Sequence, residues 1–283
     1  VAAELIEQAQ QETCLDTFDS ESYREGLDIL ISDLNDESPA DQFVQRNRND
    51  IVSALATRLR VTNYLRQRPE LLARPIERPI FVFGIPRTGT TLLSNLLAAD
   101  PAHRSPLMWE IDEPIPPPTT ATLFNDPRAL AKLKVERELL EAIPEAGKYY
   151  RMSAIYPNEC MFFMLHDFKA LLWEGRGKLR NYRDWLYETD MTSTYQYHKR
   201  FLQLLQADAP GTWNLKMPSH ALWLTTVLKV YPDARLVWTH RDPFAATGSF
   251  CSLIAISHQV FAGKVDTQFL GEDCSYQAAL HAN

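Results

Sequence analysis

A short glycine-containing segment at residues 84–91 carries residue types that could bind an anion. Gly84 and Gly89 are separated by four residues, and the segment holds one arginine and three threonines: Arg87, Thr88, Thr90 and Thr91. The apolar run at 80–85 predicts a buried strand, and leucines at helical spacing after residue 91 predict a helix. The first N–H groups of a helix have no partner within it and lie at the positive end of its dipole. The segment therefore predicts an anion site.

The glycine spacing matches only the first part of the P-loop pattern G-x-x-x-x-G-K-[ST]. Thr90 occupies the lysine position, and the positive charge lies inside the loop at Arg87. Because that lysine normally contacts the β- and γ-phosphates, its absence argues against a nucleoside triphosphate. The loop suits one 5′-phosphate that carries a transferable group. An ordinary turn with incidental glycines is the alternative.

Two further basic residues are expected at the same edge of a parallel sheet. The segments 212–217 and 234–239 predict strands, the second of them buried, and they end near Lys216 and Arg241. Pro243 suits the start of a helix that would contain Ser249. Ligands bind where parallel strands end and helices begin. We therefore expect one basic pocket formed by Arg87, Lys216 and Arg241. The alternative is that the three residues fall at strand-to-helix junctions by chance.

Acidic residues that could serve as a general base lie between these segments. Glu110 follows Trp109 in the proline-dense segment 103–120, which should form neither a regular helix nor a central strand. An aromatic neighbour can raise the pKa of a carboxyl group towards the useful range for a base. Glu159 and His166 are seven residues apart in the apolar segment 159–173, which predicts one helix with both on the same face. They could equally be polar groups buried in a core.

The overall composition describes an ordinary globular protein of 283 residues with 45% hydrophobic and 23% charged residues. The net charge of −7 argues against general nucleic-acid binding but permits a local basic pocket. No apolar run approaches 18 residues and the start of the chain has no signal-peptide pattern, so we expect no membrane span and a cytoplasmic protein. The four cysteines form no CxxC pair or Cys/His spacing typical of zinc. We therefore expect free thiols and no metal.

The predicted elements divide the chain into a helical N-terminal cap and an α/β domain. Helical patterns at 1–11, 22–34 and 41–68 predict a cap over residues 1–75 that packs on the core or supports a homodimer. Residues 76–283 predict a P-loop-like, three-layer α/β domain with a central parallel sheet. A mostly helical insertion at about 105–205 would supply the acceptor site. Six aromatic residues could line it: Trp109, Tyr149, Tyr150, Phe162, Phe163 and Trp173.

Three short blocks resemble the sulfotransferases that use 3′-phosphoadenosine 5′-phosphosulfate (PAPS), particularly the tyrosylprotein and bacterial types. The blocks are PRTGTTLL at 86–93, Lys216 with its spacing to Arg241, and Arg241 with Ser249. The resemblance spans about residues 80–253. It implies that Arg241 and Ser249 hold the 3′-phosphate and that Lys216 stabilises the leaving phosphate. The 5′-phosphosulfate would be held by Arg87, Thr88, Gly89, Thr90 and Thr91.

The resemblance also implies that Glu110 is the general base, because it corresponds in position to the glutamate base of the tyrosylprotein enzymes. His103, His166 and Glu159 are the alternative bases. The family usually has further C-terminal structure, beyond the third block, that helps to close over the nucleotide.

The predicted reaction is transfer of a sulfuryl group from PAPS to a hydroxyl of a small-molecule or glycan acceptor, leaving 3′-phosphoadenosine 5′-phosphate (PAP). Such a transfer needs cations aimed at the equatorial and leaving oxygens and a base for the hydroxyl, but no metal. A nucleotide kinase or NTPase with a degenerate P-loop is one alternative. A non-catalytic nucleotide-binding scaffold is the other.

Overall fold

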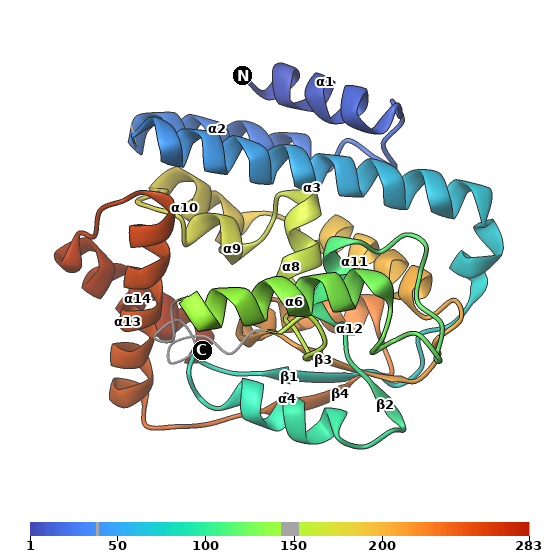
Figure 1. Ribbon diagram of the computed structural model, residues 1–283. Helices are drawn as coiled ribbons and strands as arrows, with labels where there is room; N and C mark the ends of the chain where they lie inside the picture. Colours follow the sequence, from blue (N-terminus) through green and yellow to red (C-terminus); the bar gives the residue numbers. More distant parts are fainter. Residues whose placement is uncertain (38–39, 143–152, 283) are drawn as a thin grey trace.

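Four parallel strands form the central sheet of the computed structural model, which describes residues 1–37, 40–142 and 153–282 (Figure 1). In sheet order they are β2 (His103–Arg104), β3 (Thr212–Lys216), β1 (Ile80–Phe83) and β4 (Arg235–Trp238). Val82 pairs with both Lys216 and Val237, so β1, β3 and β4 end at the same edge. This arrangement confirms the predicted α/β fold with a central parallel sheet.

The two middle strands are buried and the outer strand β4 is not. Every residue of β1 is buried, as expected for a strand covered on both faces. In β4, Leu236 and Trp238 keep 39% and 43% of their surface exposed. The prediction of a buried strand was therefore wrong for β4. Its apolar composition resembles that of β1, but it pairs on one side only.

Helices cover both faces of the sheet (Figure 1). Helix α4 (Thr90–Ala98) packs on β1 and β3 from one face, whereas α8 (Met161–Met164), α11 (Thr192–Leu205) and α12 (Leu224–Val230) lie on the other. The 3₁₀ helix η3 (Pro218–Trp223) follows β3 and packs against β1. Two longer helices, α13 (Pro243–Phe261) and α14 (Thr267–Ala282), follow β4 and pack on each other.

The N-terminal segment forms three helices that lie together along one side of the molecule (Figure 1). They are α1 (Ala2–Thr13), α2 (Arg24–Glu37) and α3 (Asp41–Gln67), followed by the 3₁₀ helix η1 (Pro69–Ala73). Leu27 and Leu55 belong to the same buried cluster as Phe81. A buried ion pair between Arg58 and Asp167, 2.7 Å apart, adds a polar connection. The cap therefore packs on the core, and its role in a dimer stays a prediction.

The region between the anion loop and β3 is less regular than predicted. The segment 159–173 does not form one helix but α8, the 3₁₀ helix η2 (Leu165–Asp167) and the start of α9 (Leu171–Glu174). Phe168 has a φ of 54°, a left-handed conformation that ends the helical path. Glu159 and His166 consequently do not share a helix face, and that prediction was wrong.

Further helices complete the region before β3, namely α5 (Met108–Asp112), α6 (Pro127–Ala142) and α10 (Arg180–Glu188). The proline-dense segment 103–120 contains β2 and α5. Both lie before residues 114–118, where four of the five residues are proline. The expectation of no regular helix there was wrong for this single short helix. β2 is an edge strand, as the proline content allows.

Within the described residues, α13 alone has the length and apolar composition of a membrane span, and 17% of its most apolar window is buried. Only length and composition select this helix, and a single helix of this kind is weak evidence for a membrane span. The expectation of no membrane span stays a prediction.

Candidate active site

The loop between β1 and α4 requires glycine at its first position. Gly84 has a φ of +152°, and a Cβ atom there would lie 2.5 Å from the carbonyl oxygen of Thr239. Gly89, at a φ of +99°, precedes the first residue of α4. These conformations are costly for other residues. The two glycines therefore let the loop pass close to the end of β4 and turn into the helix.

Thr88 fastens this loop to the neighbouring strand. Its hydroxyl lies 2.7 Å from the carbonyl oxygen of Ile85 and 2.7 Å from the hydroxyl of Thr239. The Thr88 hydroxyl is thus already hydrogen-bonded within the protein. Any contribution of Thr88 to anion binding would therefore come from its backbone N–H. Thr91, by contrast, is exposed at the start of α4.

Arg87, Arg241 and Ser249 lie together, although 154 residues separate the two arginines along the chain. Arg87 Nε donates to Ser249 Oγ at 3.1 Å, and a guanidinium nitrogen of Arg241 donates to the Arg87 carbonyl oxygen at 3.1 Å. Both arginines are exposed. Within the part of the chain that the structure describes, neither forms an ion pair with a carboxylate. The charges remain available to an anion.

A small cavity of about 160 Å³ adjoins this cluster. The rings of Trp238 and His240 stack at its wall with centroids 5.0 Å apart. The lining combines the loop, the end of β4 and the end of α14: Ile85, Thr88, Trp238, Thr239, His240, Arg241 and Ala282. An aromatic surface next to two arginines suits a planar ring that carries a phosphate.

Lys216 connects the anion loop to Glu159 on the sheet edge. Its Nζ atom lies 3.3 Å from Thr91 Oγ1 and 2.5 Å from Glu159 Oε1. The side chain of Lys216 is 4% exposed and that of Glu159 is 17% exposed. Glu159 is held there because it forms a bridge to Lys216 and the following Cys160 N–H donates to the Lys216 carbonyl oxygen at 3.0 Å.

The structure does not bring Glu110 to this cluster. Glu110 is fully buried, and its two carboxylate oxygens accept from Arg104 at 2.9 and 2.6 Å, with a third bond from the Leu107 N–H at 2.8 Å. Arg104 also binds the carbonyl oxygens of Leu205 and Ala209, which precede β3. The pair therefore lies towards the amino end of β3, whereas Lys216 is at the carboxyl end. The base role of Glu110 stays a prediction, but burial against Arg104 and distance from the Lys216 end of the strand argue against it.

The two histidine candidates also lie apart from Lys216. His166 is buried with Nδ1 3.1 Å from the Tyr197 hydroxyl, and burial lowers its pKa to about 3. His103 pairs with Thr212 at the amino end of β3 and its Nδ1 lies 3.0 Å from the Leu97 carbonyl oxygen. Neither arrangement suits a base for a substrate bound at Lys216.

The proposed aromatic lining of the acceptor site is mostly core. Phe163 and Trp173 belong to the main buried cluster, and Trp109 to a smaller one with Leu107. Phe162 is partly buried against the main cluster. Tyr149 and Tyr150 lie outside the described residues.

The chain resembles known proteins over most of its length. Residues 79–282 match the model of a family described as the sulfotransferase family. The crystal structure of sulfotransferase STF9 from Mycobacterium avium is 42% identical with a TM-score of 0.92, covering 99% of this chain and 73% of that one. Sulfotransferase STF1 from Mycobacterium tuberculosis H37Rv is 31% identical with a TM-score of 0.85, covering 100% and 80% respectively. No curated protein matches the chain. On this evidence of sequence and fold, the chain belongs to the sulfotransferase family.

Proposed function

We propose that this enzyme transfers a sulfuryl group from PAPS to the hydroxyl of a small-molecule or glycan acceptor. The observation that carries the proposal is the contact of Lys216 Nζ with both Thr91, at the start of α4, and Glu159. A cation therefore lies between the predicted anion site and an acidic side chain. This is the order of groups that an in-line transfer to a hydroxyl requires.

The residues present fit the two ends of the nucleotide donor. The free N–H groups at the start of α4 and the guanidinium of Arg87 would hold the 5′-phosphosulfate. Arg241 and Ser249 would hold the 3′-phosphate, and both already contact Arg87. Two exposed arginines that lie beside the anion loop and have no carboxylate partner among the described residues support this assignment.

The donor supplies the sulfuryl group, and the protein supplies charge and a proton acceptor. Lys216 would turn from Glu159 towards the oxygen that bridges phosphate and sulfur, and would stabilise the negative charge that develops there. Glu159, released from Lys216, would accept the proton of the acceptor hydroxyl. The sulfur–oxygen bond to phosphate breaks as the bond to the acceptor oxygen forms, and PAP leaves. This assigns the base role to Glu159 instead of Glu110.

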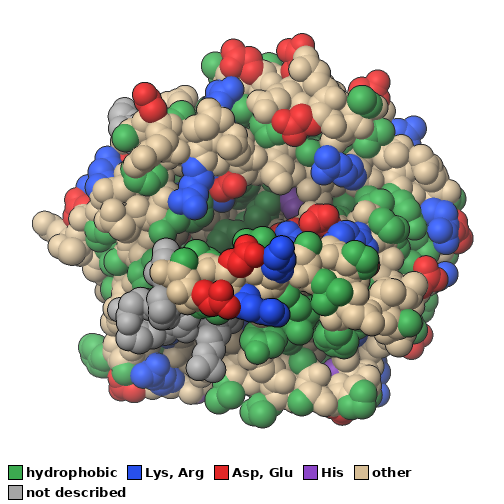
Figure 2. Space-filling model, in the orientation of Figure 1, with side chains coloured by type: hydrophobic (Ala, Val, Ile, Leu, Met, Phe, Trp, Pro, Cys, Tyr) green, Lys and Arg blue, Asp and Glu red, His purple; other side chains and the backbone are tan. Residues whose placement is uncertain are grey.

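The face that carries α6 is hollowed, with hydrophobic side chains in the hollow and charged side chains around it (Figure 2). A mixed surface of this kind suits an acceptor that combines an apolar body with hydroxyl groups. We propose this hollow as the acceptor site.

The central test compares two variants, Glu159→Gln and Glu110→Gln, because these two glutamates are the candidates for the general base. Glu159→Gln should lower the transfer rate at saturating PAPS by about 10²–10⁴-fold, as expected for loss of a general base. PAP affinity should stay near the wild-type value. Glu110→Gln should keep the rate per folded molecule but lower the free energy of unfolding by about 3–5 kcal/mol, because it leaves Arg104 buried without its partner. The rate is measured with sulfur-labelled PAPS over a panel of acceptors, and affinity by calorimetry.

The opposite pattern, with loss of transfer only in Glu110→Gln, would restore the original assignment. ATP binding in preference to PAP would favour a kinase or NTPase. Tight PAP binding without transfer to any acceptor would favour the scaffold.

A further inference from the structure

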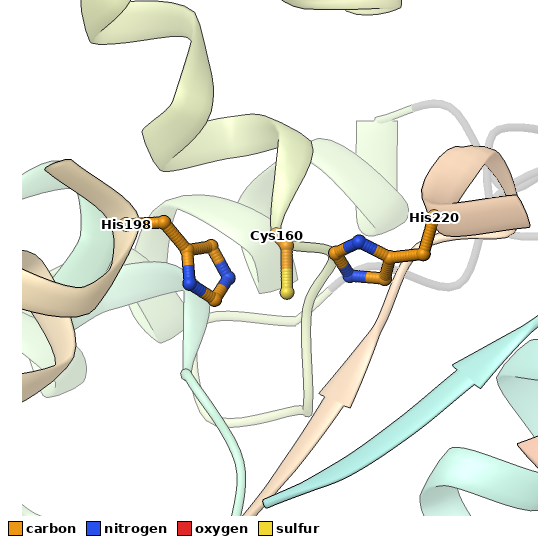
Figure 3. A group of neighbouring side chains, drawn as sticks. All are labelled: Cys160, His198 and His220. Carbon is orange, nitrogen blue, oxygen red and sulfur yellow. The ribbon is translucent and has the colours of Figure 1, made fainter. Parts of the chain in front are cut away.

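Three side chains far apart in the sequence meet behind the active-site lysine. Cys160 precedes α8, His198 lies in α11 and His220 lies in η3, and one ligand atom from each lies within 4.8 Å of the others. The Cys160 sulfur lies between the two imidazole rings (Figure 3). All three side chains are fully buried. Their sequence positions give no metal-binding spacing, which is why the sequence did not reveal the group.

The imidazole rings are oriented for coordination through the same nitrogen. His198 Nδ1 lies 2.6 Å from the Tyr231 hydroxyl, and His220 Nδ1 lies 2.8 Å from the Tyr195 hydroxyl. The Nε2 atoms of both rings are buried and have no hydrogen-bond partner. Buried polar atoms are normally paired, and an unpaired one is costly. A hydrogen bond to the second ring nitrogen is the usual support for a metal-binding histidine.

From these contacts we infer that Cys160, His198 and His220 form a binding site for a soft, thiophilic metal ion, with Sγ and the two Nε2 atoms as ligands. Around one ion, a thiolate and two imidazoles stand roughly 3.3–3.8 Å apart at usual bond lengths. One nitrogen of each ring and the Cys160 sulfur already lie within 4.8 Å of one another, so binding requires an approach of at most about 1.5 Å. The site differs from the proposed sulfuryl-transfer site and does not rest on it.

Charge selects a monovalent ion of the Cu⁺ type. Two neutral imidazoles and one thiolate carry a single negative charge, which Cu⁺ balances completely. Zn²⁺ would leave a net positive charge in a buried site, and would favour a fourth ligand. The charged groups beside Cys160 are Lys216 and Glu159, and they form an ion pair with each other at 2.5 Å. The rings of Phe81 and Phe163 pack against His198, so the surroundings are apolar. Thiolate with imidazole is a ligand set that suits copper.

Metal coordination requires both imidazoles in the neutral form and Cys160 as a thiolate. Metal binding then forms the metal–thiolate bond and releases one proton to solvent.

The site would join three elements beneath the transfer site. Cys160 is hydrogen-bonded through its N–H to the Lys216 carbonyl oxygen, and His220 follows Lys216 by four residues. A bound ion would fix α8, α11 and η3 relative to the end of β3. Binding should accordingly raise the thermal unfolding temperature, because the unfolded chain does not hold the three ligands together.

The test is an anaerobic titration of the full chain with Cu⁺ against a chromophoric chelator, with Zn²⁺ in a parallel titration. One equivalent of Cu⁺ should bind in preference to Zn²⁺ and raise the unfolding temperature. X-ray absorption at the copper edge should show one sulfur and two imidazole nitrogens. Cys160→Ser should bind no Cu⁺ and show no rise in unfolding temperature when Cu⁺ is added. Cys14→Ser, which changes an exposed thiol, should bind one equivalent of Cu⁺ and show the same rise as the wild type. Tyr195→Phe should weaken binding by about 10–100-fold through loss of the hydrogen bond to His220.

Three outcomes would overturn the inference. A two-sulfur environment would place the metal instead at Cys251 and Cys274, which pack together in a separate cluster with Phe250 and Leu270. Preference for Zn²⁺ would remove the monovalent assignment. If the wild-type chain binds neither Cu⁺ nor Zn²⁺, the proposed metal site does not exist. The absorption measurement uses the wild-type protein, so it decides the matter even if Cys160→Ser fails to fold.

Discussion

At the scale of single residues, the 3′-phosphate assignment depends on Arg241. Replacing it with alanine should weaken PAP binding by about 10–150-fold, which corresponds to about 1.5–3 kcal/mol for hydrogen bonds to a charged group. AMP binding should change little, because AMP has no 3′-phosphate. Calorimetric titration of both nucleotides measures the difference.

Arg235→Ala provides the matched control for this substitution. Arg235 begins β4, at the opposite end of the strand from Arg241, and its Nε donates to the Arg78 carbonyl oxygen at 3.1 Å. Arg235→Ala should leave the ratio of PAP affinity to AMP affinity unchanged. Equal losses of PAP and AMP affinity in Arg241→Ala would contradict the 3′-phosphate assignment.

The residues of the basic cluster could be predicted from sequence because topology alone determines them. Lys216 ends β3 and Arg241 follows β4, and parallel strands end at one edge. Their placement beside the loop of Arg87 and Thr91 therefore required no knowledge of side-chain packing. The base could not be chosen in the same way. The resemblance favoured Glu110 and kept Glu159 as an alternative, and only the structure shows that Glu110 pairs with the buried Arg104 and Glu159 with Lys216.

At the scale of elements, the start of α13 positions both Arg241 and Ser249. The Asp242 carboxylate caps this helix by accepting from the Ala245 N–H at 2.8 Å. Asp242→Ala should lower the free energy of unfolding by about 1 kcal/mol, the usual cost of a lost cap. It should also weaken PAP binding, because the adjacent arginine and the helix become less well fixed. Chemical denaturation and calorimetry measure the two effects.

Asp266→Ala separates these two effects. Asp266 accepts from the Phe269 N–H at 3.0 Å at the start of α14, and it also contacts Lys178. This variant should lose stability yet keep PAP affinity. Asp242→Asn should retain most of the cap. If all three variants bind PAP as tightly as the wild type, the start of α13 has no role in positioning the nucleotide site.

Helices and strands were predictable from sequence where one periodic pattern extended over the whole element. The cap helices and β1 are examples, since their apolar spacing repeats without interruption. The segment 159–173 was not predictable, because its continuous apolar character fits a helix although Phe168 adopts a left-handed conformation. Burial of β4 was not predictable either, because strand order decides which strand lies at the edge.

At the scale of the whole molecule, buried neutral histidines should make stability depend on acid. Burial lowers the pKa of His166 to about 3 and that of His281 to about 4. The ordinary value near 6.5 applies in the unfolded chain. Between these values the unfolded state binds more protons than the folded state, so the free energy of unfolding rises with pH. Full stability is present above about pH 6.5 and is lost as the pH falls towards 3–4.

Each such histidine should contribute a slope of about 1.4 kcal/mol per pH unit within that window. His166→Gln should reduce the slope by one such increment, whatever it does to stability at pH 7, because the slope counts protons and not packing contacts. The exposed His240 provides the control, since His240→Gln removes a histidine without removing a buried one. Urea unfolding at several pH values from 5 to 7 measures the slopes. An unchanged slope in His166→Gln would mean that this ring is already protonated in the folded protein, with its charge compensated despite the neighbouring Arg58.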